Sequence, residues 1–294
     1  MGLGYNGKLY ILAFDHRGSF TKRFGIEGDP TPEETERIAD GKHLIFEGLE
    51  VALGRGADPA VTGALVDEQF GGPSKVPEEA KAAHIKLAMP VEKSGQKEFD
   101  FEYGDDFGAH IERYDPDFSK VLVRYNPDGD PDLNQRQTER LARLADWLHE
   151  HDRKFLFELL VPAEEEQLAA VGGDTDRYDA ELRPELMRRT IAEFQDAGVE
   201  ADIWKIEGVD TRDDCERIAA THKVPNAAGR SAPTAVTARG RSPYGPSRDR
   251  SNRPTPMSGS AASFRSKAHR STLRDTPRSD TSRKAVKNDG GMWP

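Results

Sequence analysis

The chain has 294 residues, a net charge of −10 at pH 7 and a 35% share of hydrophobic residues, values typical of a globular protein. No run approaches the roughly 18 apolar residues of a membrane span, and residues 1–4 lack the basic and apolar regions of a signal peptide. The single cysteine, Cys215, excludes an internal disulfide and a cysteine-based zinc site, so we expect a cytoplasmic protein that does not enter a membrane.

Six apolar strands separated by helical patterns follow along residues 1–223. The strands are expected at 8–15, 61–67, 85–92, 120–125, 155–162 and 202–210. Strands that alternate with helices indicate a parallel sheet with right-handed crossovers. No glycine-rich nucleotide fingerprint follows the first strand, which favours the (β/α)8 TIM-barrel lineage over an open doubly wound sheet. We therefore interpret residues 1–223 as a barrel domain truncated after its sixth βα unit.

The helix after the first strand has the clearest signals. Thr31 is its expected N-cap, Pro32 its first residue and Glu34 the end of a capping box. Its apolar stripe consists of Ile38, Ile45, Leu49 and Ala52. Further helices are expected from about Pro77, around 141–148 and over 184–197. The segment 93–114 is too long for an ordinary connection, and we expect a lid or rim there.

Residues 224–294 have a different composition from the rest. Residues 1–220 carry 27 Lys and Arg against 48 Asp and Glu, whereas residues 221–294 carry 15 against 4. Arg, Ser and Pro dominate this tail and its apolar residues are isolated, so we expect it to be disordered. A basic tail can bind nucleic acid. No aromatic residues are interleaved with the basic ones, however, and nucleic acid is not an expected partner.

Polar residues follow the predicted strands at their carboxyl ends, where barrels of this kind form their active sites. They are Asp15 and Arg17 from the first strand, Asp67 from the second, Glu92 from the third, Lys120 and Arg124 from the fourth, Glu158 from the fifth and Lys205 from the sixth. A divalent ion held by Asp15, Asp67 and Glu92 is a minor alternative. No histidine cluster joins these carboxylates, and we expect no metal.

Lys205 and Glu158 are the most unusual of these residues because each is embedded in an apolar strand, where an unpaired charge costs several kcal/mol. One interpretation is a structural ion pair in a non-catalytic or inactive, truncated barrel. The other is an amine nucleophile with a carboxylate that moves protons. The nucleophile must be neutral, a form favoured by desolvation and by a second cation such as Lys120 or Arg124. Glu158 would then lie nearer the substrate hydroxyl than the lysine does.

Five motifs in chain order carry a family resemblance. They are FDHRGS at 14–19, EKSG at 92–95, KVLVRY at 120–125, FE at 157–158 and WKIE at 204–207. Together they resemble the tagatose-1,6-bisphosphate aldolase-type class I aldolases. Within that group the resemblance is closest to the aldolase-like domain fused to the sugar kinase of bacterial myo-inositol catabolism, and it covers residues 5–222. One departure is His16, which stands where the sugar-bisphosphate aldolases have glutamine.

The resemblance implies a (β/α)8 barrel that cleaves a ketose phosphate through a Schiff base without a cofactor. Lys205 matches the Schiff-base lysine and Glu158 the acid/base residue, whereas Lys120 and Asp15 match polar residues of the pocket. Arg17 belongs to the Asp-x-Arg-Gly-Ser motif. For the inositol branch the implied substrate is 6-phospho-5-dehydro-2-deoxygluconate. A homo-oligomer is compatible with this lineage.

The tail leads to a prediction about the gene. Its 71 residues equal about two βα units, the number that an eight-stranded barrel still lacks, and its composition is that of GC-rich DNA translated out of frame. We expect a frameshift near Lys223. Translation of the other two reading frames beyond that codon should recover two apolar strands with helices. If neither frame contains them, this interpretation of the tail is wrong.

Overall fold

Seven strands form one parallel sheet, and their spatial order is the order of the chain. The computed structural model describes residues 4–221 and the backbone of residues 235–238, all within one compact unit of residues 1–246. The strands are β1 (Tyr10–Ala13), β2 (Thr62–Leu65), β3 (Lys86–Pro90), β4 (Phe118–Arg124), β5 (Lys154–Leu160), β6 (Ile203–Glu207) and β7 (Ala235–Ala238). The sequential parallel order and the helices between strands are those of the barrel lineage and confirm the predicted fold class.

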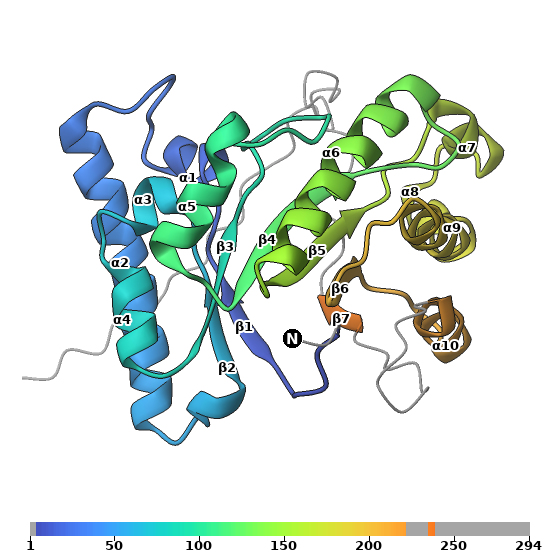
Figure 1. Ribbon diagram of the computed structural model, residues 1–294. Coiled ribbons are helices and arrows are strands. Elements are labelled where there is room, and N and C mark those ends of the chain that lie inside the picture. Colours follow the sequence, from blue (N-terminus) through green and yellow to red (C-terminus); the bar gives the residue numbers. More distant parts are fainter. Residues whose placement is uncertain (1–3, 222–234, 239–294) are drawn as a thin grey trace, which may run out of the picture. The chain divides into compact units, whose positions relative to one another are not determined.

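The helices cover the outer face of the curled sheet, with α2 to α5 beside the first strands and α6 to α10 beside the later ones (Figure 1). None in the described part of the chain is long and apolar enough to cross a bilayer. They are α1 (Gly18–Arg23), α2 (Pro32–Gly54), α3 (Glu68–Gly71), α4 (Val76–Ala82), α5 (Phe107–Tyr114), α6 (Pro131–Glu150), α7 (Glu165–Ala170), α8 (Thr175–Glu181), α9 (Arg183–Asp196) and α10 (Arg212–Thr221), with 3-10 turns η1 (Pro59–Val61) and η2 (Gly104–Asp106).

The start of α2 is the one predicted from the sequence. The backbone N–H of Glu34 donates to Thr31 Oγ1 at 3.3 Å, and the backbone N–H of Thr31 donates to Glu34 Oε2 at 2.9 Å. This capping box satisfies two backbone donors that a helix end leaves unpaired. It fixes the point at which the chain leaves the loop after β1 and begins its return along the sheet.

Two elements differ from the sequence prediction. Strand β7 lies in the tail that we expected to be without strands, and it pairs in parallel with β6 from Trp204↔Ala235 to Glu207↔Ala238. A strand of four residues is too short for a period-2 pattern to show, and its pairing depends on backbone groups alone. Helix α5 lies in the predicted lid, where Phe107 and Ile111 are buried one turn apart. The domain boundary at residue 223 and the rest of the tail lie outside the described residues.

The two faces of the sheet have different cores. On the inner face, one side chain from each of β2 to β6 forms an apolar layer: Leu65, Ala88, Phe118, Leu156 and Ile203. On the outer face, Phe157 of β5 lies 4.6 Å from the ring of Trp204 on β6 and 5.0 Å from the ring of Phe194 on α9, as measured between centroids. Because side chains alternate along a strand, the positions two residues after the inner layer also point inward.

We expect the aromatic contact on the outer face to contribute strongly to stability. Replacement of the fully buried Phe157 by alanine should lower the free energy of unfolding by about 3–5 kcal/mol, since it leaves a cavity between β5 and α9. The matched control is Leu44→Ala on the exposed side of α2, where the change should stay within about 0.5 kcal/mol. Urea denaturation of both variants checks this. Equal losses would contradict the assigned core.

Candidate active site

The register of the sheet places Glu158 and Lys205 side by side. They are directly paired across β5 and β6, on the inner face and one layer beyond Leu156 and Ile203. Lys205 Nζ donates a hydrogen bond to Glu158 Oε1. The side chains are 21% and 15% exposed, so the pair is shielded from bulk water but remains reachable. Two residues that sequence motifs placed on neighbouring strands thus form one ion pair.

Lys120 on β4 is the centre of a larger charge cluster. Its Nζ lies 2.8 Å from Asp15 Oδ2, 2.9 Å from Glu92 Oε1 and 3.3 Å from Glu158 Oε2. Burial opposes the charged form of Lys120, but the three carboxylates outweigh it and raise the pKa of its ammonium above the ordinary value. Burial likewise raises the pKa of Asp15, but Lys120 outweighs it and brings that pKa to about 2. Both groups are therefore ionised at neutral pH.

Arg17 links the loop after β1 to the segment after β3. Its guanidinium donates to the backbone oxygen of Glu92 at 2.8 Å, to Glu92 Oε1 at 3.2 Å and to Glu102 Oε2 at 3.0 Å. Burial raises the pKa of Glu92, against the effect of Lys120 and Arg17. Glu102 was not among the predicted site residues, and no pattern in its acidic surroundings distinguishes it.

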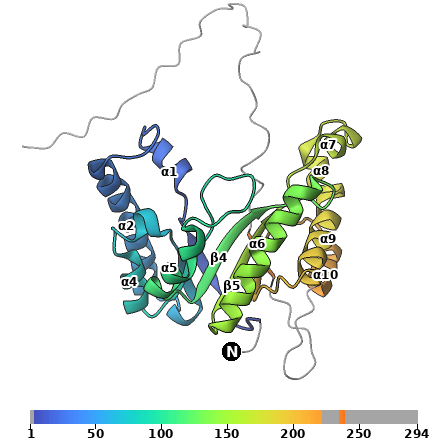
Figure 2. The ribbon, with the colours of Figure 1, turned by 45° about the horizontal axis from the view of Figure 1, so that its top comes forward.

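These residues line a cavity of about 480 Å³ at the carboxyl ends of the strands. Helix α1 and the segment after β3 lie at the same end of the sheet (Figure 2). Residues of both line the cavity, together with Lys205 of β6. Seven of the predicted site residues contribute to its wall: Asp15, Arg17, Glu92, Lys120, Arg124, Glu158 and Lys205. A volume of this size accommodates a small metabolite.

Asp67 is the predicted site residue that the structure does not bring to the cavity wall. It is fully buried, and its Oδ1 lies 2.6 Å from Nζ of Lys42 on α2. Burial lowers the pKa of Lys42 and raises that of Asp67, each against the charge of the other. Lys42 also donates to the backbone oxygens of Phe14 and His16, so this ion pair holds the loop after β1 in place.

Lys42 was not among the predicted site residues, although the sequence carries a signal for its burial. Position 42 falls between Ile38 and Ile45 on the apolar stripe of α2, one turn from each. A lysine there must be buried with the stripe, and a buried ammonium requires a partner. The partner, Asp67, comes from the end of β2.

Two details of the proposed chemistry differ from the expectation. Lys120 contacts three carboxylates, so its charge is balanced locally and it is not an isolated second cation beside Lys205. Glu158 is in direct contact with the Lys205 amine instead of standing apart from it. The metal alternative also differs from the structure: Asp67 is paired with Lys42 and not with Asp15 and Glu92, and no group of three His, Cys, Asp or Glu side chains among residues 4–221 is arranged to hold an ion.

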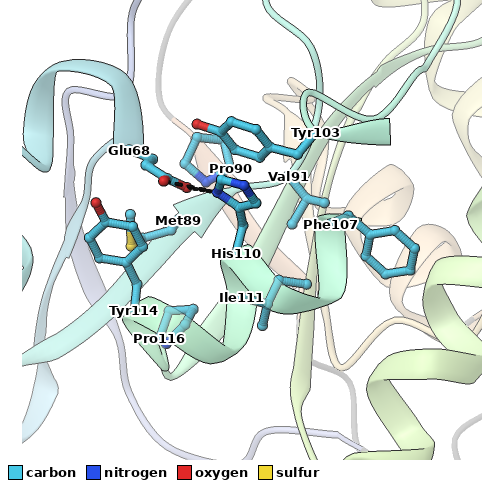
Figure 3. Close-up of a pocket in the computed structure, with 10 residues that line it drawn as sticks. All are labelled: Glu68, Met89, Pro90, Val91, Tyr103, Phe107, His110, Ile111, Tyr114 and Pro116. Carbon is cyan, nitrogen blue, oxygen red and sulfur yellow. Dashed lines mark hydrogen bonds and ion pairs between the residues drawn. The ribbon is translucent and has the colours of Figure 1, made fainter. Parts of the chain in front are cut away.

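A second cavity lies between α3 and α5, on the outer side of β3 (Figure 3). His110 Nδ1 lies 2.8 Å from Glu68 Oε2, and the ring of Tyr103 stacks on the imidazole with a centroid separation of 3.5 Å. Burial, followed by the charge of Glu68, raises the pKa of Tyr103. The cavity volume of about 20 Å³ has room for roughly one water molecule. We therefore interpret the cluster as a structural contact that holds the end of the segment after β3 against α3.

The comparisons with known proteins identify a family. The family model described as "Uncharacterized protein conserved in bacteria (DUF2090)" matches residues 5–228, and the chain belongs to this family. One similar solved structure is Cgl0159 from Corynebacterium glutamicum, with 16% identity and a TM-score of 0.47 over 80% of this chain and 70% of that chain. Another is a Schiff base forming fructose-1,6-bisphosphate aldolase, with 16% identity and a TM-score of 0.41 over 74% and 73%. No curated protein matches the chain.

The ion pair of Asp15 with Lys120 predicts a pH dependence of stability. Because the folded state lowers the pKa of Asp15 to about 2, its stabilisation is complete above the ordinary value of about 3.9 and is lost as the pH falls through 2. Asp15→Asn should cost about 2 kcal/mol near neutral pH, and its difference from wild type should shrink between pH 4 and pH 2. Denaturant titrations across this range measure it.

The matched control is Asp146→Asn on the exposed face of α6, where the aspartate forms no ion pair within the described chain. Its stability should run parallel to that of wild type over the same pH range. A gap between Asp15→Asn and wild type that stays constant down to pH 2 would show that the carboxylate of Asp15 is not stabilised by Lys120.

Proposed function

We propose that this member of the family is a Schiff-base (class I) aldolase that cleaves a ketose phosphate. The observation that carries the proposal is the contact between the Lys205 amine and the Glu158 carboxylate inside the cavity, with Lys120 on the other oxygen of the same carboxylate. An amine nucleophile needs a base in direct reach, and the base needs an orienting partner. The five motifs that resemble the tagatose-type aldolases support the same assignment.

Glu158 begins the reaction as the base. Its carboxylate takes a proton from the Lys205 ammonium through their hydrogen bond, and the neutral amine attacks the keto carbon of the substrate. The carbonyl oxygen takes up a proton from the attacking nitrogen and becomes a hydroxyl, which leaves as water when Glu158 returns the proton that it took from the ammonium. The product of this half is an iminium between Lys205 and the substrate.

Cleavage uses the same carboxylate a second time. Glu158 takes the proton of the hydroxyl on the carbon beyond the bond to be broken, and that oxygen forms the aldehyde carbonyl. The electron pair of the carbon–carbon bond moves into the iminium and gives an enamine. Glu158 then returns its proton to the enamine carbon, and hydrolysis of the resulting iminium by water releases the second product and restores the Lys205 amine. Lys120 stays protonated throughout and keeps Glu158 in position.

The substrate follows from the resemblance to the inositol branch of these aldolases, for which it is 6-phospho-5-dehydro-2-deoxygluconate. An anionic sugar derivative suits a cavity whose wall holds more lysines and arginines than aspartates and glutamates. The carboxylates of Asp15 and Glu92 are acceptors for sugar hydroxyls. Retro-aldol cleavage of this ketose would yield two three-carbon fragments.

Borohydride reduction tests the assignment of Lys205. The protein is incubated with a ketose phosphate and then treated with borohydride, which reduces any Schiff base to a stable adduct. Peptide mass spectrometry should find the adduct on Lys205 alone. Lys205→Met should abolish the adduct because no amine remains. Glu158→Gln should slow its formation by about 10²- to 10⁴-fold, the usual effect of removing a general acid/base.

Lys86→Met is the control, since Lys86 lies at the amino end of β3 with Asp117 at 2.7 Å and does not line the cavity. It should label as wild type does. An adduct that persists in Lys205→Met would refute Lys205 as the nucleophile. A wild-type protein that never labels, together with a Lys205→Met variant of equal or greater stability, would favour the structural ion pair instead.

A further inference from the structure

The charge of the cavity is opposite to that of the domain around it. Residues 1–220 have 27 Lys and Arg against 48 Asp and Glu. The residues that line the cavity include seven Lys and Arg against four Asp and Glu. A concave site with an excess of one charge focuses the electrostatic field on its mouth and attracts ligands of the opposite charge. The cavity is thus a local region of positive charge on an acidic domain.

The deep cations of the cavity already have partners. Lys205 contacts Glu158, Lys120 contacts three carboxylates, and Arg17 contacts Glu92 and Glu102. A ligand anion would compete with these carboxylates for the same ammonium and guanidinium groups. The deep end therefore suits the carbonyl and hydroxyl groups of a substrate better than a strong anion.

Three lysines at the mouth differ from the deep cations. Lys22 belongs to the last turn of α1, and Lys93 and Lys97 belong to the segment after β3. All three are exposed, and none forms an ion pair within residues 4–221. The fourth acidic residue of the wall, Glu98, is bound by Arg136 at 2.9 Å and by Arg140 at 2.7 Å. Its charge is thereby balanced from outside the cavity.

The segment that carries Lys93 and Lys97 is held in place at several points. A single antiparallel bridge joins Glu92 to Phe101, and the backbone N–H of Lys93 donates to the backbone oxygen of Asp100 at 2.9 Å. In its middle, Arg124 donates to the backbone oxygen of Gln96 at 3.0 Å. These hydrogen bonds restrain the backbone that carries the two lysines, which lowers the entropy cost of binding a ligand there.

We infer that Lys22, Lys93 and Lys97 bind the phosphate of the substrate at the mouth of the cavity, while its carbonyl reaches Lys205 at the deep end. This inference rests on the proposed function for the identity of the ligand. It places the phosphate on the first and third βα units, a position that depends on no residue beyond the sixth strand. Barrels of this kind commonly bind phosphate after strands seven and eight. This chain would instead use its amino-terminal half.

Binding of dihydroxyacetone phosphate to the full chain tests the inference without requiring a reaction. The probe is titrated into the Lys205→Met variant and followed by ³¹P NMR. In that background, Lys22→Gln, Lys93→Gln and Lys97→Gln together should weaken binding by about tenfold or more, because three ammonium contacts are lost. Unphosphorylated dihydroxyacetone, applied to chains that retain Lys205 and trapped with borohydride, should label Lys205 equally with or without the three mouth substitutions.

The matched control replaces Lys8, Lys75 and Lys81 by glutamine, since these lysines are exposed and lie outside the cavity. The net charge changes equally, but affinity for the phosphate should change less than about twofold, an effect of screened long-range charge only. Equal weakening in both triple variants, no weakening in either, or no binding of the probe at all would overturn the inference. Binding at the mouth without labelling of Lys205 would instead refute the proposed function and leave the phosphate site standing.

Discussion

The ammonium of Lys120 is the interaction on which the site depends. It is 1% exposed and contacts carboxylates that arrive from the first, third and fifth strands. A buried charge without partners would cost several kcal/mol, so these elements must close on Lys120 together. The same contacts that satisfy one lysine therefore set the distances between strands that are far apart in the sequence. The contacts that form around Lys120 during folding therefore also assemble the site.

This cluster orients the carboxylate of Glu158. One of its oxygens is held at 3.3 Å from Lys120, which leaves the other for Lys205 on the next strand. Because Lys120 keeps its proton, the carboxylate has a fixed positive neighbour at one oxygen and the Lys205 amine at the other. This asymmetry suits a residue that must pass the same proton back and forth. A simple isolated ion pair would have no need of the second lysine.

The sequence predicted most of the strands and the central pair because those features have local signals. Lys205 and Glu158 interrupt apolar runs, and Thr31 and Glu34 form a pattern that needs only four residues. The contact of Glu102 with Arg17 had no such signal, since only the tertiary fold brings these two residues together. Lys42 had a local signal on the apolar stripe of α2, but the identity of its partner, Asp67, again depends on the tertiary fold. Strand β7 was missed for a related reason. Its pairing with β6 depends on backbone groups, which any short extended segment supplies.

The charge cluster also shows which part of the chain supplies the candidate active site. All of its members, from Asp15 to Lys205, come from the first six strands, and the edge of β6 beyond them is covered by β7. The residues that would form, cleave and hydrolyse an iminium are thus assembled before the chain leaves its sixth βα unit. What later residues add to a barrel is closure of the sheet and shielding from water. The contact between Lys205 and Glu158 needs neither, so the proposed nucleophile and its base are already in place within the first six βα units.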